Sequence, residues 1–158
     1  MRIKVAIFSV LIVGASIGPV LAFDKLPASA VPIPADELKA AYSGKTIKWP
    51  DASMYWAPDG TVIGIHDKAV GDGTWSVSDG KVCNDVTWLG EKPSDKPWPL
   101  KNCFSFMRVG NTIYHRFTSD KMKSDKGWWR GKSDIPRLKE GNLIQEQYDA
   151  NKALKQKS

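Results

Sequence analysis

Residues 73–84 read GTWSVSDGKVCN, and this stretch decides the fold. Trp75 and Val77 alternate with small polar residues, which is the period-2 pattern of a strand with one buried side. The Asp79-Gly80 corner that follows is a tight-turn signal, and a second β-prone segment comes directly after it. The stretch therefore predicts a β-hairpin.

The same pattern occurs twice more along the chain. One copy spans residues 54–66 with a turn at Gly60, and the other spans residues 103–117 with a turn at Gly110. Three hairpins in series predict a mainly β fold, an antiparallel up-and-down meander. About seven strands of this length usually curl, because closure removes exposed sheet edges. We expect a small lipocalin-like barrel or a strongly bent sheet, with a flat two-sheet sandwich as the alternative.

Two segments have helical character. Residues 35–44 begin with acidic side chains, place Leu38 and Tyr42 at helical spacing and end at a glycine. They predict a short N-terminal helix that packs over one end of the sheet. Asn142 could cap a second, C-terminal helix that runs to about Lys155.

Proline marks two segments that we expect to lie outside the sheet. Residues 23–34 hold three prolines among small residues, which predicts an extended lead-in that packs against nothing. Residues 91–101 hold three more, and because proline cannot donate to a ladder we expect a long loop there. Residues 35–134 then form the barrel-like domain, and residues 135–158 form a polar C-terminal tail with the short helix.

The first 22 residues have the organisation of a secretory signal peptide. Arg2 and Lys4 precede an apolar run of about 13 residues, and small residues stand at −3 and −1 of a cleavage site after Ala22. The run is shorter than the roughly 20 residues that a membrane-spanning helix needs, and an uncleaved anchor is the alternative. We expect export, cleavage after Ala22 and a mature protein of 136 residues that spans no membrane.

Cleavage would lower the net charge from +6 to +4, because residues 1–22 contain two basic and no acidic side chains. The densest basic stretch, residues 121–132, is interleaved and flanked with aspartates. This favours a solvated loop over a patch for anionic polymers. An exported protein rarely meets nucleic acid, so we expect no nucleic-acid partner.

Cys83 and Cys103 are the two cysteines. An oxidising compartment would allow them one intramolecular bond, and neither a Cys-x-x-Cys spacing nor a neighbouring histidine points to a redox or metal site. We expect a structural disulfide. Closing a loop of about 20 residues should contribute roughly 3 kcal/mol to stability.

The sequence also contains seven tryptophans, a residue type that stacks on sugar rings and lines apolar pockets. Trp75 lies within a predicted strand, so we expect it in the core. Trp88 and Trp98 flank the proline-rich loop, where they have less to pack against. Adjacent Trp128 and Trp129 would point to opposite faces of a strand, so only one of them can be core.

Histidine and serine patterns give no sign of catalysis. His66 and His115 lack a spacing typical of a metal site, and no serine lies in a Gly-x-Ser-x-Gly turn. We assign no catalytic residue, no metal and no cofactor. The candidate ligand contacts are Trp88, Trp98, Trp128, Trp129, Arg130 and His115.

The order of the motifs carries a family resemblance. Glu37-Leu38 precedes YSGKT at 42–46, a DGT turn occupies 59–61, G-x-W-x-V-x-x-G-x-x-C spans 73–83, and CF at 103–104 precedes YHR at 114–116. In this order the chain resembles the DUF995 family of uncharacterised exported proteins of alphaproteobacteria, rhizobia in particular, over roughly residues 35–130. The resemblance implies a periplasmic protein of a Gram-negative bacterium and supplies no catalytic or binding residue.

We therefore expect a non-catalytic periplasmic protein that binds an envelope component, such as a glycan, a lipid or a small amphiphile. The first alternative is a protein-interaction module, for instance an inhibitor or regulator of an envelope enzyme. The second is a hydrolase that uses His115 as a base. The sequence leaves the oligomeric state open.

Overall fold

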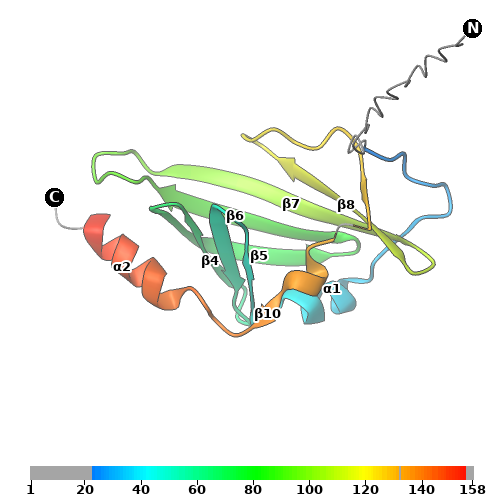
Figure 1. Cartoon of the computed structure of the whole chain (residues 1–158), viewed down its shortest axis with the longest axis horizontal. Coiled ribbons are helices and arrows are strands. Elements are labelled where there is room, and N and C mark those ends of the chain that lie inside the picture. The colour runs from blue at the N-terminus through cyan, green and yellow to red at the C-terminus, as the bar shows by residue number, and fades with distance from the viewer. Residues whose placement is uncertain (1–22, 132, 156–158) are drawn as a thin grey trace, which may run out of the picture.

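The computed structural model describes residues 23–131 and 133–155, and the predicted signal peptide lies outside them (Figure 1). The helices are α1 (Ala35–Tyr42) and α2 (Gln145–Lys155), with a 3-10 turn at Ile135–Arg137. The strands are β1 (Val31–Pro32), β2 (Lys45–Lys48), β3 (Ala52–Trp56), β4 (Thr61–His66), β5 (Ala69–Ser78), β6 (Lys81–Leu89), β7 (Trp98–Val109), β8 (Thr112–Ser119), β9 (Trp129–Arg130) and β10 (Lys139–Glu140).

The strands form one antiparallel sheet in the order β10-β2-β3-β4-β5-β6-β7-β8-β9. From β2 to β9, neighbours in the sheet are neighbours in the chain, so the predicted meander is confirmed. Strand β1 lies outside this path and pairs with the end of β7 that β6 does not reach. Gly60, Gly80 and Gly110 adopt positive φ in the three predicted turns, a conformation that glycine adopts without strain.

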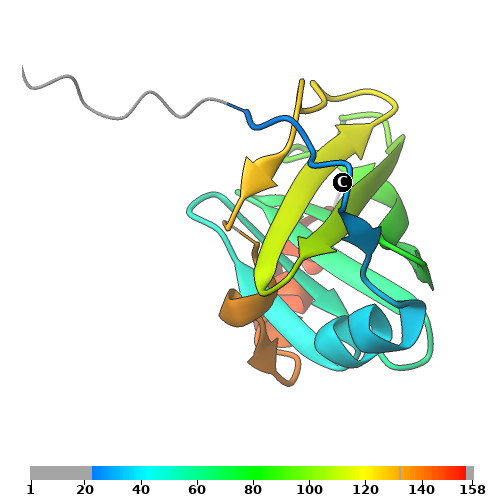
Figure 2. The same ribbon diagram turned by 90° about the vertical axis from the view of Figure 1, so that its right-hand side faces the viewer.

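The sheet is strongly bent and open rather than closed (Figure 2). The end strands of the order, β9 and β10, are short and do not pair with each other. Gly73 shows how closely the strands approach in the bend, because a Cβ at this position would lie 2.0 Å from the carbonyl oxygen of Asp85. Of the expected architectures, the bent sheet is the one that forms.

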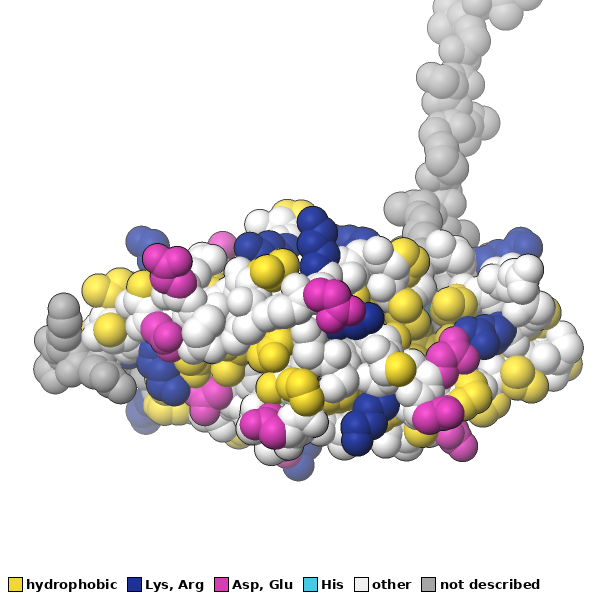
Figure 3. Space-filling model, turned by 90° about the horizontal axis from the view of Figure 1, so that it is seen from below, with side chains coloured by type: hydrophobic (Ala, Val, Ile, Leu, Met, Phe, Trp, Pro, Cys, Tyr) yellow, Lys and Arg dark blue, Asp and Glu magenta, His cyan; other side chains and the backbone are white. Residues whose placement is uncertain are grey.

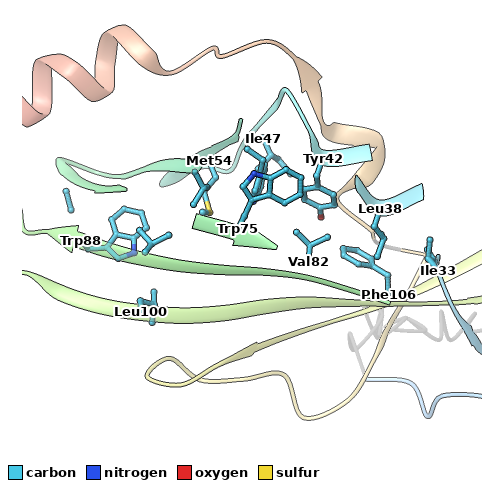
Figure 4. Packing of buried hydrophobic residues seen from close by; sticks show 14 residues of the cluster. Ile33, Leu38, Tyr42, Ile47, Met54, Trp75, Val82, Trp88, Leu100 and Phe106 are labelled. Carbon is cyan, nitrogen blue, oxygen red and sulfur yellow. The ribbon is translucent and has the colours of Figure 1, made fainter. Parts of the chain in front are cut away.

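Alternating side chains give the sheet two different faces. On the concave face, Leu38 and Tyr42 of α1 pack with Trp56 and Phe106 of the sheet, and all four are almost completely buried. In Figure 4, the side chains drawn in the space from Met54 on one side to Ile33 on the other lie close together in this cluster. The short N-terminal helix is therefore confirmed, and it fills one end of the concave face.

Helix α2 packs against β4 and β5 on the other face of the sheet (Figure 1). Ile144 and Tyr148 are buried there with Ile65 and Val70. The Tyr148 hydroxyl donates to Asp72 Oδ1 at 2.7 Å. The predicted C-terminal helix is confirmed, and among residues 23–131 and 133–155 no helix is long and apolar enough to cross a bilayer.

Two expectations about proline were wrong. The lead-in is extended, but it does pack, because Ile33 is buried in the core and β1 pairs with β7. The predicted loop at 91–101 is shorter, because β7 begins at Trp98 and Thr87 pairs with Pro99. Strand β8 reaches β7 only from Asn102 onward, so Pro99 lies on a locally free strand edge where its missing N–H leaves no ladder bond unmade.

Charge is distributed over the surface without a single-sign patch on the side that Figure 3 shows. Basic and acidic side chains are interspersed there, with apolar side chains between them. The surface also carries exposed ion pairs, for example Lys101 with Asp85 and Lys152 with Asp72. Exposed pairs of this kind contribute little to stability.

Candidate functional site: an apolar cavity on the concave face

The end of the concave face away from α1 is hollow. A cavity of about 570 Å³ lies there. On one side it is bounded by the β2–β3 loop and the end of β4, and on the other by the end of β6, the first part of β7 and the end of β8. In Figure 4, Trp88 and Leu100 mark this end and stand apart from the dense cluster near α1. Cavities of roughly 300–1,000 Å³ with apolar walls are typical of small-molecule sites.

Most of the side chains that line the cavity are apolar. The aromatic ones are Trp49, Trp88, Trp98, Phe104 and Phe117. The aliphatic ones are Pro50, Ala52, Met54, Leu100 and Met122. The polar ones are Asp51, His66 and Asn102. The lining thus combines a large apolar surface with few polar groups, which then fix the orientation of a ligand.

The Trp88 indole lies flat over two residues without side chains. Gly64 and Gly71 are cross-strand partners, and Gly71 also pairs with Trp88. A Cβ on Gly64 would lie 2.8 Å from Trp88 Cη2, and one on Gly71 would lie 2.7 Å from Trp88 Cδ2. Since the ring occupies the space that these side chains would take, it stays close to the sheet and leaves the centre of the concave face empty.

Two parallel aromatic pairs form walls of the cavity. Trp88 and Trp98 are cross-strand partners whose ring centroids lie 6.4 Å apart with planes at 16°. Trp49 and Phe104 have the same separation and angle. Trp49 is held in place by its Nε1, which donates to Asp134 Oδ2 at 3.1 Å. Trp98 is 38% exposed, so the mouth of the cavity presents an aromatic surface to solvent.

A hydrogen-bonded relay connects the cavity to the core. The Nε1 group of buried Trp56 donates to Asn84 Oδ1 at 2.8 Å, and Asn84 Nδ2 donates to Asn102 Oδ1 at 2.9 Å. Asn84 is only 2% exposed, whereas Asn102 lines the cavity. The relay supplies a fixed polar group in an otherwise apolar wall.

The mouth carries the cavity's ionisable side chains. Asp51 Oδ2 lies 3.7 Å from His66 Nε2, and both side chains are more than half exposed. Met122, which is 55% exposed, lies in the segment after β8. That segment is anchored by Ser124, whose hydroxyl accepts from Ser119 N, and by Asp125, which accepts from Phe117 N.

The candidate contacts on β9 lie outside this cavity. Trp129 packs on Phe23, with ring centroids 4.6 Å apart, and pairs with His115 in the sheet. The backbone of Trp128 pairs with that of Asp24. Arg130 is exposed and pairs with Tyr114. Of the six sequence candidates, the structure brings together Trp88 and Trp98 at the cavity and places the other four elsewhere.

His115 lies beside Phe106, and its buried Nδ1 has no hydrogen-bond partner. Burial lowers the pKa of His115, and the charges of Asp134 and Asp125 offset part of this shift. In the part of the chain that the structure describes, His115 makes no hydrogen bond to a carboxylate, and no group of three or more potential metal ligands is found.

Cys83 and Cys103 form a disulfide, as predicted. They are direct cross-strand partners in the β6–β7 pair. Because side chains alternate along a strand, the bond lies on the opposite face from their neighbours Asn84 and Asn102. The disulfide therefore fixes the register of the two strands that carry the relay and the Trp88–Trp98 pair.

A protein-family model matches most of the chain. The model of a family described as a protein of unknown function, DUF995, matches residues 9–144. The chain belongs to the DUF995 family. The match is longer than the resemblance seen in the sequence, since it continues through β10 to Ile144, a buried residue directly before α2. Comparisons with curated proteins and with solved structures gave no match.

Sequence reasoning missed most of the cavity of this DUF995 protein, although one signal was available. Once Cys83 and Cys103 are paired in an antiparallel hairpin, the register places Asn84 opposite Asn102 and Trp88 opposite Trp98. The expected loop at 91–101 hid this consequence. Trp49, Met54 and Phe117 come from distant strands, and no local pattern connects them.

Proposed function

We propose that this protein is a non-catalytic binding protein for a small apolar or amphiphilic molecule of the cell envelope. The observation that carries the proposal is the aromatic-lined cavity of about 570 Å³. Burial of apolar ligand surface against these walls would drive binding. The stacked Trp88–Trp98 pair would contact the ligand at the mouth.

The lining favours an amphiphile over a glycan. A sugar carries many hydroxyl groups, and each one buried without a partner disfavours binding. The cavity offers Asn102 inside and Asp51 and His66 at its mouth, with apolar side chains elsewhere. A molecule with a large apolar part and one or two polar atoms fits this composition better.

Displacement of a fluorescent probe tests the proposal. N-phenyl-1-naphthylamine is an uncharged apolar dye, and we expect it to bind the purified protein at one site and to quench tryptophan fluorescence. Straight-chain alcohols and ketones should displace it, whereas N-acetylglucosamine oligomers should not.

Two variants locate the binding site. Leu100→Trp replaces an isobutyl group in the cavity lining by a bulkier indole ring and should weaken dye binding by at least about tenfold, which corresponds to roughly 1.4 kcal/mol. Leu154→Trp, the same change at an exposed apolar residue of α2 outside the cavity, is the matched control and should change the affinity less than twofold. Equal binding by both variants, or displacement by glycans alone, would contradict the proposal.

We further propose that the protein acts in the periplasm. The signal-peptide pattern of residues 1–22 supports this proposal, as does a disulfide between Cys83 and Cys103, since such bonds persist in oxidising compartments. Mass spectrometry of the protein from a periplasmic extract should find an N-terminus at Phe23. An N-terminus before Pro19, or recovery of the protein only from the cytoplasm, would contradict it.

A further inference from the structure

The direction of the hydrogen-bonded relay determines which ligand atom the cavity can accept. An indole N–H can only donate, so Asn84 must turn its Oδ1 toward Trp56. Its Nδ2 then points to Asn102, which must accept through Oδ1. The group of Asn102 that can still bond to a ligand in the cavity is therefore Nδ2, which can only donate.

The reverse direction is excluded by burial. If Asn84 were turned over, its NH₂ group would face the N–H of Trp56, and two donors would meet without an acceptor. Trp56 is 0% exposed and Asn84 is 2% exposed, so water cannot satisfy them. Unpaired buried donors are strongly disfavoured.

The charges of the lining residues restrict the class of ligand further. Among the residues that the structure describes, no Lys or Arg lines the cavity, and the ionisable lining residues, Asp51 and His66, lie at its mouth. A carboxylate or phosphate brought to Asn102 would be buried in apolar surroundings without a counter-charge. The acceptor that reaches Asn102 is therefore uncharged.

We infer that the cavity selects an uncharged acyl-chain or similarly apolar molecule that carries a hydrogen-bond acceptor, such as a ketone, ester or amide carbonyl, at its buried end, and that Asn102 Nδ2 is the donor. This inference rests on the proposed binding function and specifies the ligand class. Asn102 acts by direct contact with the ligand, whereas Trp56 is a positioning residue, because it fixes the direction of the relay from outside the cavity.

A pair of isosteric probes isolates the acceptor. The compounds 2-undecanone and 2-methyl-1-undecene differ only in C=O against C=CH₂, and each would be titrated against the dye complex. The ratio of the two affinities is measured for the unmodified protein and for each variant. The difference in water solubility between the probes is the same in every measurement, so it cancels when these ratios are compared. Undecanoate is the charged probe and should displace the dye more weakly than the ketone.

Three variants test the role of the relay. Asn102→Leu keeps the size of the side chain and removes the donor, so the preference for the ketone should fall about fivefold to tenfold. Asn102→Asp at pH 8 still accepts from Asn84 but no longer donates, and it should show the same fall even if the leucine variant folds poorly. Trp56→Phe lets both asparagines turn over, so it should weaken the preference without changing any residue that lines the cavity.

The outcomes separate this inference from the proposed function. Binding of both probes with an unchanged affinity ratio in the two Asn102 variants would overturn the inference and leave the binding function intact. Failure of the dye to bind the unmodified protein, together with failure of both probes to bind when they are titrated directly by tryptophan fluorescence, would overturn the proposed function as well. Stronger displacement by undecanoate than by the ketone would contradict an uncharged ligand.

Discussion

The two ends of the concave face lie on the same bent sheet and differ in how they are filled. At one end, α1 inserts Leu38 and Tyr42 against Trp56 and Phe106. At the other end no helix formed by residues 23–131 or 133–155 covers the concave face, and the Trp88 ring lies flat over Gly64 and Gly71. The cavity therefore lies where no side chains of α1 enter and where Gly64 and Gly71 let the Trp88 ring lie against the sheet.

The largest expected effect comes from one leucine truncation made at each end. Leu38→Ala should lower the free energy of unfolding by about 3–5 kcal/mol, because it empties a well-packed site. Leu100→Ala should lower it by only about 2 kcal/mol, because Leu100 already borders the cavity and loses fewer contacts. Urea unfolding measures both, and equal losses would mean that the second end is as densely packed as the first.

Removal of the disulfide should have the next largest effect. The variant with Cys83→Ser and Cys103→Ser should be less stable by about 2–4 kcal/mol. Because α1 holds the filled end, hydrogen exchange should increase more in the parts of β6 and β7 near Trp88 and Trp98 than near Phe106. A uniform increase along both strands would show that the two ends unfold together.

A substitution at Gly71 tests whether the glycines beneath the Trp88 ring keep the cavity open. Gly71→Ala places a Cβ within 2.7 Å of the Trp88 ring, so it should destabilise the protein by about 1–3 kcal/mol and weaken dye binding by pushing the indole into the cavity. The double variant with Trp88→Leu should recover only part of the lost stability, because the smaller side chain removes the clash with the indole while the Cβ still lies 2.6 Å from Val86 Cγ1. Strict additivity of the two changes would contradict this contact.

The smallest expected effect is a pH dependence at the filled end. Burial lowers the pKa of His115 below its value in the unfolded chain, so the unfolded state binds the proton more readily. Stability is therefore full above about pH 6.5 and declines as the pH falls below that value. The midpoint of unfolding, measured as a function of pH, should therefore fall less below this pH in His115→Gln than in the unmodified protein. An identical fall in both proteins would mean that other groups cause the loss of stability.

The fold was largely predictable because its signals are local. The alternation around Trp75 and the turn glycines predicted the hairpins, and the spacing of Leu38 and Tyr42 predicted α1. The site was less predictable. Trp88 and Trp98 were recognised as candidates, but Asn102 was missed because its importance depends on Trp56, a residue 46 positions away in the sequence.

The sequence by itself determined the antiparallel meander, the two helices and the disulfide, because period-2 alternation, turn residues and capping act over a few neighbouring positions. Only the tertiary structure decided that the sheet bends without closing, that Pro99 can stand in a strand and that one end of the concave face stays hollow. These features depend on how distant strands approach one another, and close packing between them is set by the whole set of side chains rather than by any local pattern.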